Sequence, residues 1–182
     1  STTPVFAGGE PLYEDLSEWL QVGASRWLFS GDGVVGKGAD GFLVSPEVFG
    51  DFELLVEFWI SSETNSGIFV HCQDRHSINP DSCYELNIWD DHPEQDSRTG
   101  SIVGRVVPPF SVVSTVNQWN TYHVIIRNSV LTVRVNEVLT AVLGQLEFSN
   151  GFIALQRWGG GNVRFRNLQI SSSITSFSQQ VE

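Results

Sequence analysis

The nonapeptide YELNIWDDH, residues 84–92, alternates apolar side chains with side chains that could do chemistry. A period of two predicts a β-strand with one apolar face, whose opposite face carries Glu85, Asn87 and Trp89 in a row. A carboxylate in the middle of a strand is costly unless it has a partner or a function. We therefore predict that Glu85 is a general base or a carboxylate that orients a ligand. The alternative is a solvated glutamate on an open sheet.

A histidine ends the preceding strand-like segment NSGIFVHC, residues 65–72. Alternation places Phe69 and His71 on the outward face, so we expect His71 to pair across the sheet with the face that carries Glu85. Imidazole titrates near neutral pH and can act as an acid, a base or a metal ligand. Glu85 and His71 are the predicted catalytic residues, and the alternative for His71 is a plain surface histidine.

Carboxamides and tryptophans on the predicted strands suit a ligand rich in hydroxyl groups. Asn87 and Gln156 are neutral groups that can bind hydroxyl or keto oxygens, although strand-to-strand hydrogen bonding would explain them equally well. Trp59, Trp89 and Trp158 could stack on sugar rings, whose C–H faces pack on indole. A tryptophan in a β-sandwich can instead fill the core or an edge.

The loop DDHPEQD, residues 90–96, gathers oxygen and nitrogen ligands at the rim of the same predicted face. Oxygen-rich loops bind calcium, and mixed histidine and carboxylate loops can hold a transition metal, so Asp90, Asp91 and His92 are candidate ligands of a divalent metal. The alternative is a solvated acidic loop. Arg105 follows the loop and could neutralise the acidic rim or hold an oxyanion of a substrate.

Strands must position these residues, because almost every periodic segment of the chain repeats every two residues. Examples are DFELLVEFWIS, residues 51–61, and VLTVRVNEVLTAVL, which folds back about Asn136-Glu137. Short strands separated by turn residues predict an all-β sandwich or barrel. A chain of 182 residues suffices for one domain with a sizeable core. We predict one antiparallel two-sheet domain over residues 1–182, with a polar tail at 172–182.

Composition narrows the classes of partner and the compartment. Ten basic against 21 acidic residues give a net charge of −11 without any basic cluster, which argues against nucleic acid and anionic membranes as partners. No apolar run approaches the roughly 18–20 residues of a membrane span. No signal peptide is recognisable and methionine is absent, so we expect processing before residue 1. Cys72 and Cys83 are free thiols or a local disulfide, of which we favour the disulfide.

Six motifs resemble, in order and spacing, those of the 3-keto-disaccharide hydrolase domain family. The matching stretches are GDFELLVEFWISSETNSGIFVHC, YELNIWDD, TGSIVG, QWNTYHVIIRNSVLTVRVNEV, GFIALQ and VRFRNLQI. The resemblance covers about residues 10–171. It departs from the usual family pattern at His71, where the family has arginine, at Asn87, where it has glutamine, and at Glu137, where it has glycine.

The resemblance implies a concanavalin A-like jelly roll of two curved antiparallel sheets, the concave one forming a groove for a carbohydrate. It also implies activity on glycosides oxidised at C3 and a periplasmic or extracellular location. Gln156 and Asp90 match positions that the family shares, so the resemblance gives Gln156 a place in the groove. For Asp90 it implies a role in substrate binding or in fixing the loop.

Three functions fit these residues. The first is an enzyme that cleaves 3-keto-glycosides by elimination and hydration with Glu85 and His71, and with Asn87, Trp89, Asp90, Gln156, Trp158 and Arg105 binding substrate. The second is a carbohydrate-binding module of the same fold without catalysis. The third is a conventional glycoside hydrolase, which needs two carboxylates roughly 5–10 Å apart. The concave strands supply one carboxylate, Glu85, and Asp90 is the only nearby second. We rank the 3-keto-glycoside enzyme first, because a bare binding platform has less use for a carboxylate and a histidine beside each other.

Overall fold

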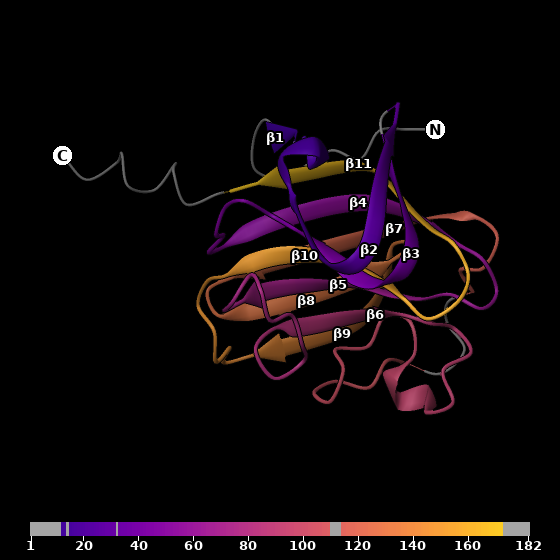
Figure 1. Cartoon of the computed structure of the whole chain (residues 1–182). Coiled ribbons are helices and arrows are strands. Elements are labelled where there is room, and N and C mark those ends of the chain that lie inside the picture. Colours follow the sequence, from indigo (N-terminus) through magenta and orange to yellow (C-terminus); the bar gives the residue numbers. More distant parts are fainter. Residues whose placement is uncertain (1–11, 14, 32, 110–113, 173–182) are drawn as a thin grey trace.

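The computed structural model describes residues 12–13, 15–31, 33–109 and 114–172, whose regular secondary structure consists almost entirely of antiparallel strands (Figure 1). The strands are β1 (Leu12–Tyr13), β2 (Leu20–Ser30), β3 (Gly33–Val44), β4 (Phe52–Ile60), β5 (Asn65–Cys72), β6 (Tyr84–Ile88), β7 (Trp119–Arg127), β8 (Val130–Val135), β9 (Val138–Gly144), β10 (Phe152–Trp158) and β11 (Val163–Ser171). The helical segments of these residues are two single 3-10 turns, η1 (Leu16–Glu18) and η2 (Gln95–Ser97). Neither turn is long and apolar enough to cross a membrane. The predicted tail at 172–182 lies, apart from Ser172, outside the described residues.

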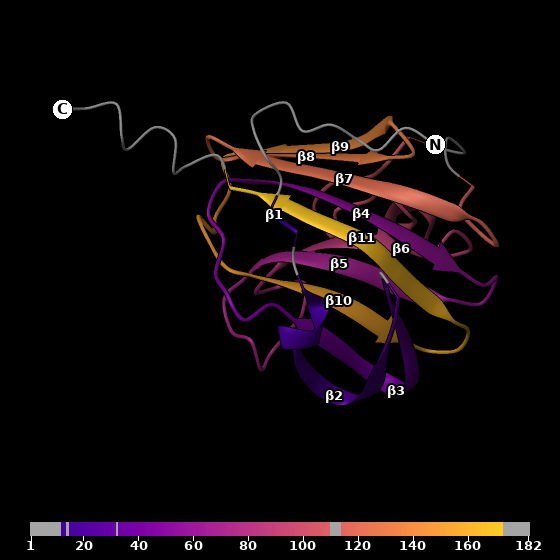
Figure 2. The same ribbon diagram turned by 90° about the horizontal axis from the view of Figure 1, so that it is seen from above.

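The strands follow the order β6-β5-β10-β3-β11-β4-β7-β8-β9, with β2 added to β3 and β1 added to β11. This continuous ribbon curls on itself, so that two layers face each other (Figure 2). We call β6, β5, β10 and the end of β3 sheet 1, and β11, β4, β7, β8 and β9 sheet 2. The prediction of an all-β sandwich of two curved antiparallel sheets is confirmed.

The main core fills the space between the two sheets, because alternate residues of each strand point inward. On β4 and β7, for example, Leu54, Phe58, Tyr122 and Val124 are fully buried. A second, smaller apolar cluster lies on the outer face of sheet 1 and comprises Phe42, Val44, Phe69, Cys72, Cys83 and Ala154. The outer face of sheet 1 is therefore not a plain solvated surface.

A β-bulge at the end of β5 turns His71 into the core. His71 has a φ of 50°, and the register between β5 and β10 shifts at this point. Its ring is fully buried beside Phe52 and Tyr84, with Nδ1 2.9 Å from the Phe148 carbonyl oxygen and Nε2 2.7 Å from the Gly50 carbonyl oxygen. The prediction that His71 faces outward beside Glu85 is wrong, because the extra residue of the bulge breaks the alternation of side chains.

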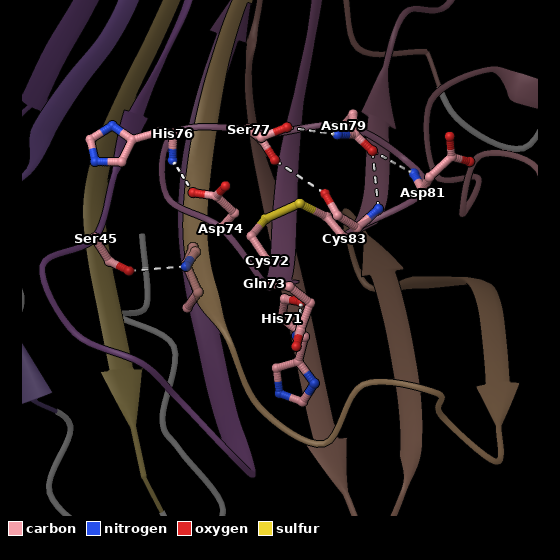
Figure 3. Close-up of a disulfide and its surroundings, with 12 residues drawn as sticks. Ser45, His71, Cys72, Gln73, Asp74, His76, Ser77, Asn79, Asp81 and Cys83 are labelled. Carbon is pink, nitrogen blue, oxygen red and sulfur yellow. Dashed lines mark hydrogen bonds between the residues drawn. A yellow bond between two sulfur atoms is a disulfide. The ribbon is translucent and has the colours of Figure 1, made fainter.

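Cys72 and Cys83 form a disulfide, the alternative that the sequence favoured (Figure 3). The disulfide closes the loop of residues 73–82, in which the Asn79 carboxamide oxygen accepts hydrogen bonds from the backbone of Asp81 and Ser82. Ile78 packs on the apolar cluster of sheet 1. The loop therefore covers one end of the outer face of sheet 1.

Candidate functional site

Strand register brings several predicted residues together on the outer face of sheet 1. One row across β6, β5, β10 and β3 consists of Asn87, Gly67, Gln156 and Phe42. The next row consists of Glu85, Phe69, Ala154 and Val44. Trp158 continues the outward series of Ala154 and Gln156 to the end of β10. Glu85, Gln156 and Trp158 thus share one face.

Glu85 is a partly buried carboxyl group on this face. Phe69 is its neighbour across the strand pair, and the Glu85 side chain makes no hydrogen bond or ion pair within the described residues. Burial disfavours the charged form and raises the pKa of Glu85 to about 7. A carboxyl group with such a pKa is populated in both protonation states near neutral pH. It can therefore serve as a general acid or a general base.

Gln156 presents a polar atom without a protein partner. Its side chain is only 6% exposed, and its Oε1 is buried without a hydrogen bond in the described part of the chain. The amide lies over Gly67, where a Cβ atom would come within 3.3 Å of Oε1 and 3.1 Å of the Leu86 carbonyl oxygen. An unsatisfied buried carbonyl is costly, and a ligand hydroxyl group could donate to it. Glycine at 67 thus makes room for the Gln156 side chain.

Trp158 gives the face an exposed aromatic surface. Its side chain is 40% exposed, and its ring lies 6.0 Å from that of Phe42, which in turn packs edge-on against Phe69 at 5.4 Å. Trp158 pairs with Asn65 on β5, whereas Glu85 pairs with Phe69. Glu85 and Trp158 are therefore separated by four residues along the strand direction and by two strand spacings across the sheet. This separation corresponds to about 16 Å between their Cα atoms. A ligand that contacts both residues must be extended.

Asn87 and Asp90 stabilise the neighbouring loop rather than face an open site. The Asn87 Nδ2 donates to the Ser97 carbonyl oxygen at 2.5 Å, and its Oδ1 accepts from the backbone of Ile88 at 3.1 Å. The Asp90 carboxylate accepts from the Thr99 hydroxyl at 2.6 Å and from the Thr115 hydroxyl and backbone at 2.7 Å each. Of the two roles considered for Asp90, these contacts favour fixing the loop.

The acidic loop does not assemble a metal site. Trp89 packs against His92, with ring centroids 4.2 Å apart, and the His92 Nδ1 accepts a hydrogen bond from the Glu94 backbone. Among the residues that the structure describes, no three His, Cys, Asp or Glu side chains converge as metal ligands would. Asp90, Asp91 and His92 are close in sequence, but they do not form the predicted metal centre.

Arg105 is directed to the core side of β6. Its guanidinium lies 4.8 Å from the ring centroid of Tyr84, a fully buried core residue, and 3.8 Å from the Glu147 carboxylate. The predicted roles of Arg105, neutralising the acidic rim or holding a substrate oxyanion, are not reflected in these contacts, which lie on the other side of β6 from the Glu85 side chain. No local pattern around Arg105 indicates this contact, since Glu147 is distant along the chain.

The fold matches solved structures that include a candidate glycosyl hydrolase and a carbohydrate-binding module. A candidate glycosyl hydrolase from Parabacteroides distasonis superposes with a TM-score of 0.74 at 22% identity, covering 90% of this chain and 98% of the other. A carbohydrate-binding module from Bacillus subtilis superposes with a TM-score of 0.66 at 17% sequence identity, and the match covers 85% of this chain and 96% of the module. A Bacillus subtilis protein with a galectin-like fold superposes with a TM-score of 0.60 at 11% sequence identity, and the match covers 92% of this chain and 98% of the other. These matches confirm the jelly-roll, lectin-like type of the fold.

No curated protein matches this chain significantly. A family model does match, and its description is "3-keto-alpha-glucoside-1,2-lyase-like domain". The match extends over residues 4–171, which is nearly the whole sequence and includes both sheets. The resemblance drawn from the six motifs is thereby confirmed, and the chain belongs to the family of 3-keto-alpha-glucoside-1,2-lyase-like domains.

Proposed function

We propose that the outer face of sheet 1 binds a glycoside oxidised at C3 and that Glu85 cleaves it by elimination. The observation that carries the proposal is the partly buried Glu85 carboxyl group, whose pKa burial raises to about 7, on the same face as Gln156 and Trp158. The family's description, which names a lyase for 3-keto-glucosides, supports the substrate and the type of reaction.

The chemistry requires a proton to leave C2 and a proton to reach the glycosidic oxygen. The C3 ketone acidifies the C2 hydrogen, so the Glu85 carboxylate can remove it while negative charge develops on the C3 oxygen. The C1–O bond then breaks to give a C1=C2 enone, and the protonated Glu85 can return the proton to the departing oxygen. Addition of water across the double bond completes a net hydrolysis. A pKa near the working pH suits both proton transfers.

Gln156 and Trp158 are the proposed binding residues. The buried Gln156 Oε1 can accept a hydrogen bond from a sugar hydroxyl, and the exposed Trp158 indole can pack on a ring face. The separation of about 16 Å between the Cα atoms of Glu85 and Trp158 favours an extended glycoside. Trp158 would then bind a part of the substrate remote from the cleaved bond.

The alternative is a carbohydrate-binding module that uses the same face without catalysis. The exposed aromatic surface of Trp158 and Phe42 favours it, since such a surface can bind sugar rings without any acid or base. The placement of His71 in the core also removes one of the two acid–base groups that the enzyme hypothesis first invoked. The similarity in fold to a carbohydrate-binding module is compatible with this alternative.

An NMR time course with 3-keto-trehalose, and with trehalose in parallel, separates the two functions. We expect the keto-sugar alone to release glucose or to form an enone, because only the ketone acidifies the C2 hydrogen. Absence of turnover of the keto-sugar would contradict the enzyme. If the NMR signals of both sugars then broadened in the presence of the protein, and Trp158→Ala abolished that broadening, the protein would be a carbohydrate-binding module that uses this face.

We also infer that the protein works in an oxidising compartment, the periplasm or the extracellular space. The Cys72–Cys83 disulfide supports this location, because structural disulfides persist mainly in such compartments. We expect thiol-blocked protein from the periplasm to contain no free thiol. Closing a loop of this length stabilises a fold by about 2–3 kcal/mol, so reductant should lower the wild-type free energy of unfolding accordingly. A Cys72→Ala/Cys83→Ala variant should not respond to reductant, and an equal response of both proteins would contradict a structural disulfide.

A further inference from the structure

The outer face of sheet 2 carries two tryptophans, each stacked with an arginine. Trp59 on β4 and Trp119 on β7 are partners across the strand pair, and Trp59 also pairs with Arg164 on β11. The Arg166 guanidinium lies 3.7 Å from the centroid of Trp119, and that of Arg164 lies 5.2 Å from the centroid of Trp59. The alternation of β11, which buries Val163 and Phe165 in the core, directs both arginines outward.

A shallow pocket of about 350 Å³ opens beside these residues. Its lining includes Ser30, Val35, Trp119, Arg164 and Arg166. Its volume is at the small end of the range of about 300–1,000 Å³ in which small-molecule sites fall. The pocket lies where β11 and β7 of sheet 2 meet the end of β2 and the start of β3, away from the face of Glu85 on sheet 1.

The two guanidinium groups differ in how they are held. Glu57 accepts from the Nε and Nη2 of Arg166 at 3.3 and 3.4 Å and also accepts from the side chain of Asn167. These contacts fix the Arg166 plane on Trp119, and Nη1 makes no hydrogen bond within the described residues. Arg164 is exposed and has no ion pair in that same part of the chain. Glu57 thus pairs with Arg166 alone, and the charge of Arg164 is not neutralised by a carboxylate of the described residues, although the protein as a whole has a net charge of −11.

We propose that this pocket binds a sugar acid, a hexuronate, through its carboxylate. Guanidinium groups bind carboxylates through paired, charge-assisted hydrogen bonds, and Arg164 and the Nη1 of Arg166 offer unused donors for them. The apolar surface of Trp119 and Val35 lies beside the arginines and can pack on the ring of the sugar. This proposal is independent of the function proposed for sheet 1.

Titration of the ¹⁵N-labelled protein with glucuronate, glucose and acetate tests the proposal. Glucose is the neutral counterpart of the ligand, and acetate is the carboxylate without the ring. We expect glucuronate to bind with a Kd of about 1 mM and to shift the indole N–H signal of Trp119, with glucose and acetate at least about tenfold weaker. Because Arg164 is exposed, Arg164→Gln should fold normally and weaken glucuronate binding about tenfold.

Arg134→Gln is the matched control, because Arg134 also points outward from sheet 2 but lies on β8, away from the pocket. It should retain the wild-type affinity for glucuronate. Absence of binding at several times the expected Kd, equal affinity for glucose or acetate, or equal weakening by the two variants would each overturn the proposal. Shifts confined to Trp158 would overturn it as well, since they would place the ligand on sheet 1.

Discussion

Replacing Glu85 by glutamine is expected to lower the turnover of a 3-keto-glycoside by about 10²–10⁴-fold, the usual contribution of a positioned general base. Glutamine keeps the shape of the side chain but cannot take the C2 proton. Because Gln156 and Trp158 are unchanged, the affinity for the substrate should fall little. Single-turnover kinetics and a binding titration of Glu85→Gln measure the two quantities separately.

The matched control is Glu47→Gln, because Glu47 is exposed in the connection between β3 and β4. It should leave turnover unchanged. The wild-type kcat/KM should rise with pH through about 7 and then level off, because the carboxylate is the active form and the pKa of Glu85 is raised to about 7. Unchanged turnover in Glu85→Gln would exclude Glu85 as the base, whatever the pH profile showed.

The stability of the fold should fall as pH rises through neutrality, because of the same carboxyl group. In the unfolded chain Glu85 has its ordinary pKa of 4.5, whereas in the folded protein burial raises the pKa to about 7. Between these values the folded state binds more protons than the unfolded state, so raising the pH favours unfolding. The contribution of Glu85 is present below pH 4.5 and is lost above 7, a change of about 3 kcal/mol.

Urea unfolding of wild type and Glu85→Gln at pH 4.5 and pH 8 measures this effect. Glutamine carries no charge at either pH, so the variant should be more stable than wild type at pH 8 by up to about 3 kcal/mol and nearly equal to it at pH 4.5. Glu47→Gln should follow the wild type at both values. Parallel stability curves for Glu85→Gln and wild type would show that burial does not oppose ionisation of Glu85.

The sequence was sufficient for the fold class and for part of the candidate site. A period of two is a local property, so it predicted the strands and the outward face of Glu85, whereas the place of Gln156 in the groove was implied by the family resemblance. The short spacing of Cys72 and Cys83 in the sequence likewise favoured a disulfide between them. The strand and face predictions depend on regular, extended backbone, whereas the disulfide prediction depends only on the short spacing of the two cysteines.

Predictions failed where the backbone is irregular, or where a residue distant in sequence determines the direction of a side chain. One bulge residue turned the His71 side chain from the outer face into the core. The residue types around His71 do not indicate that its φ is 50°. Arg105 contacts Tyr84 and Glu147, which are distant from it along the chain. Such partners are set by how loops pack after the sheets have formed, which no local pattern encodes.

The position of β11 has a consequence for how the chain reaches its native state. Residues 163–171 pair with β3 on one side and β4 on the other, and these pairings join the two halves of the ribbon. During synthesis the other strands emerge first, so β3 and β4 keep open edges until the last strand arrives. Pairing Gly36 with Val163 closes a very long loop, and contacts of this kind slow folding. Completion of the sandwich is therefore a late event that waits for the C-terminal strand.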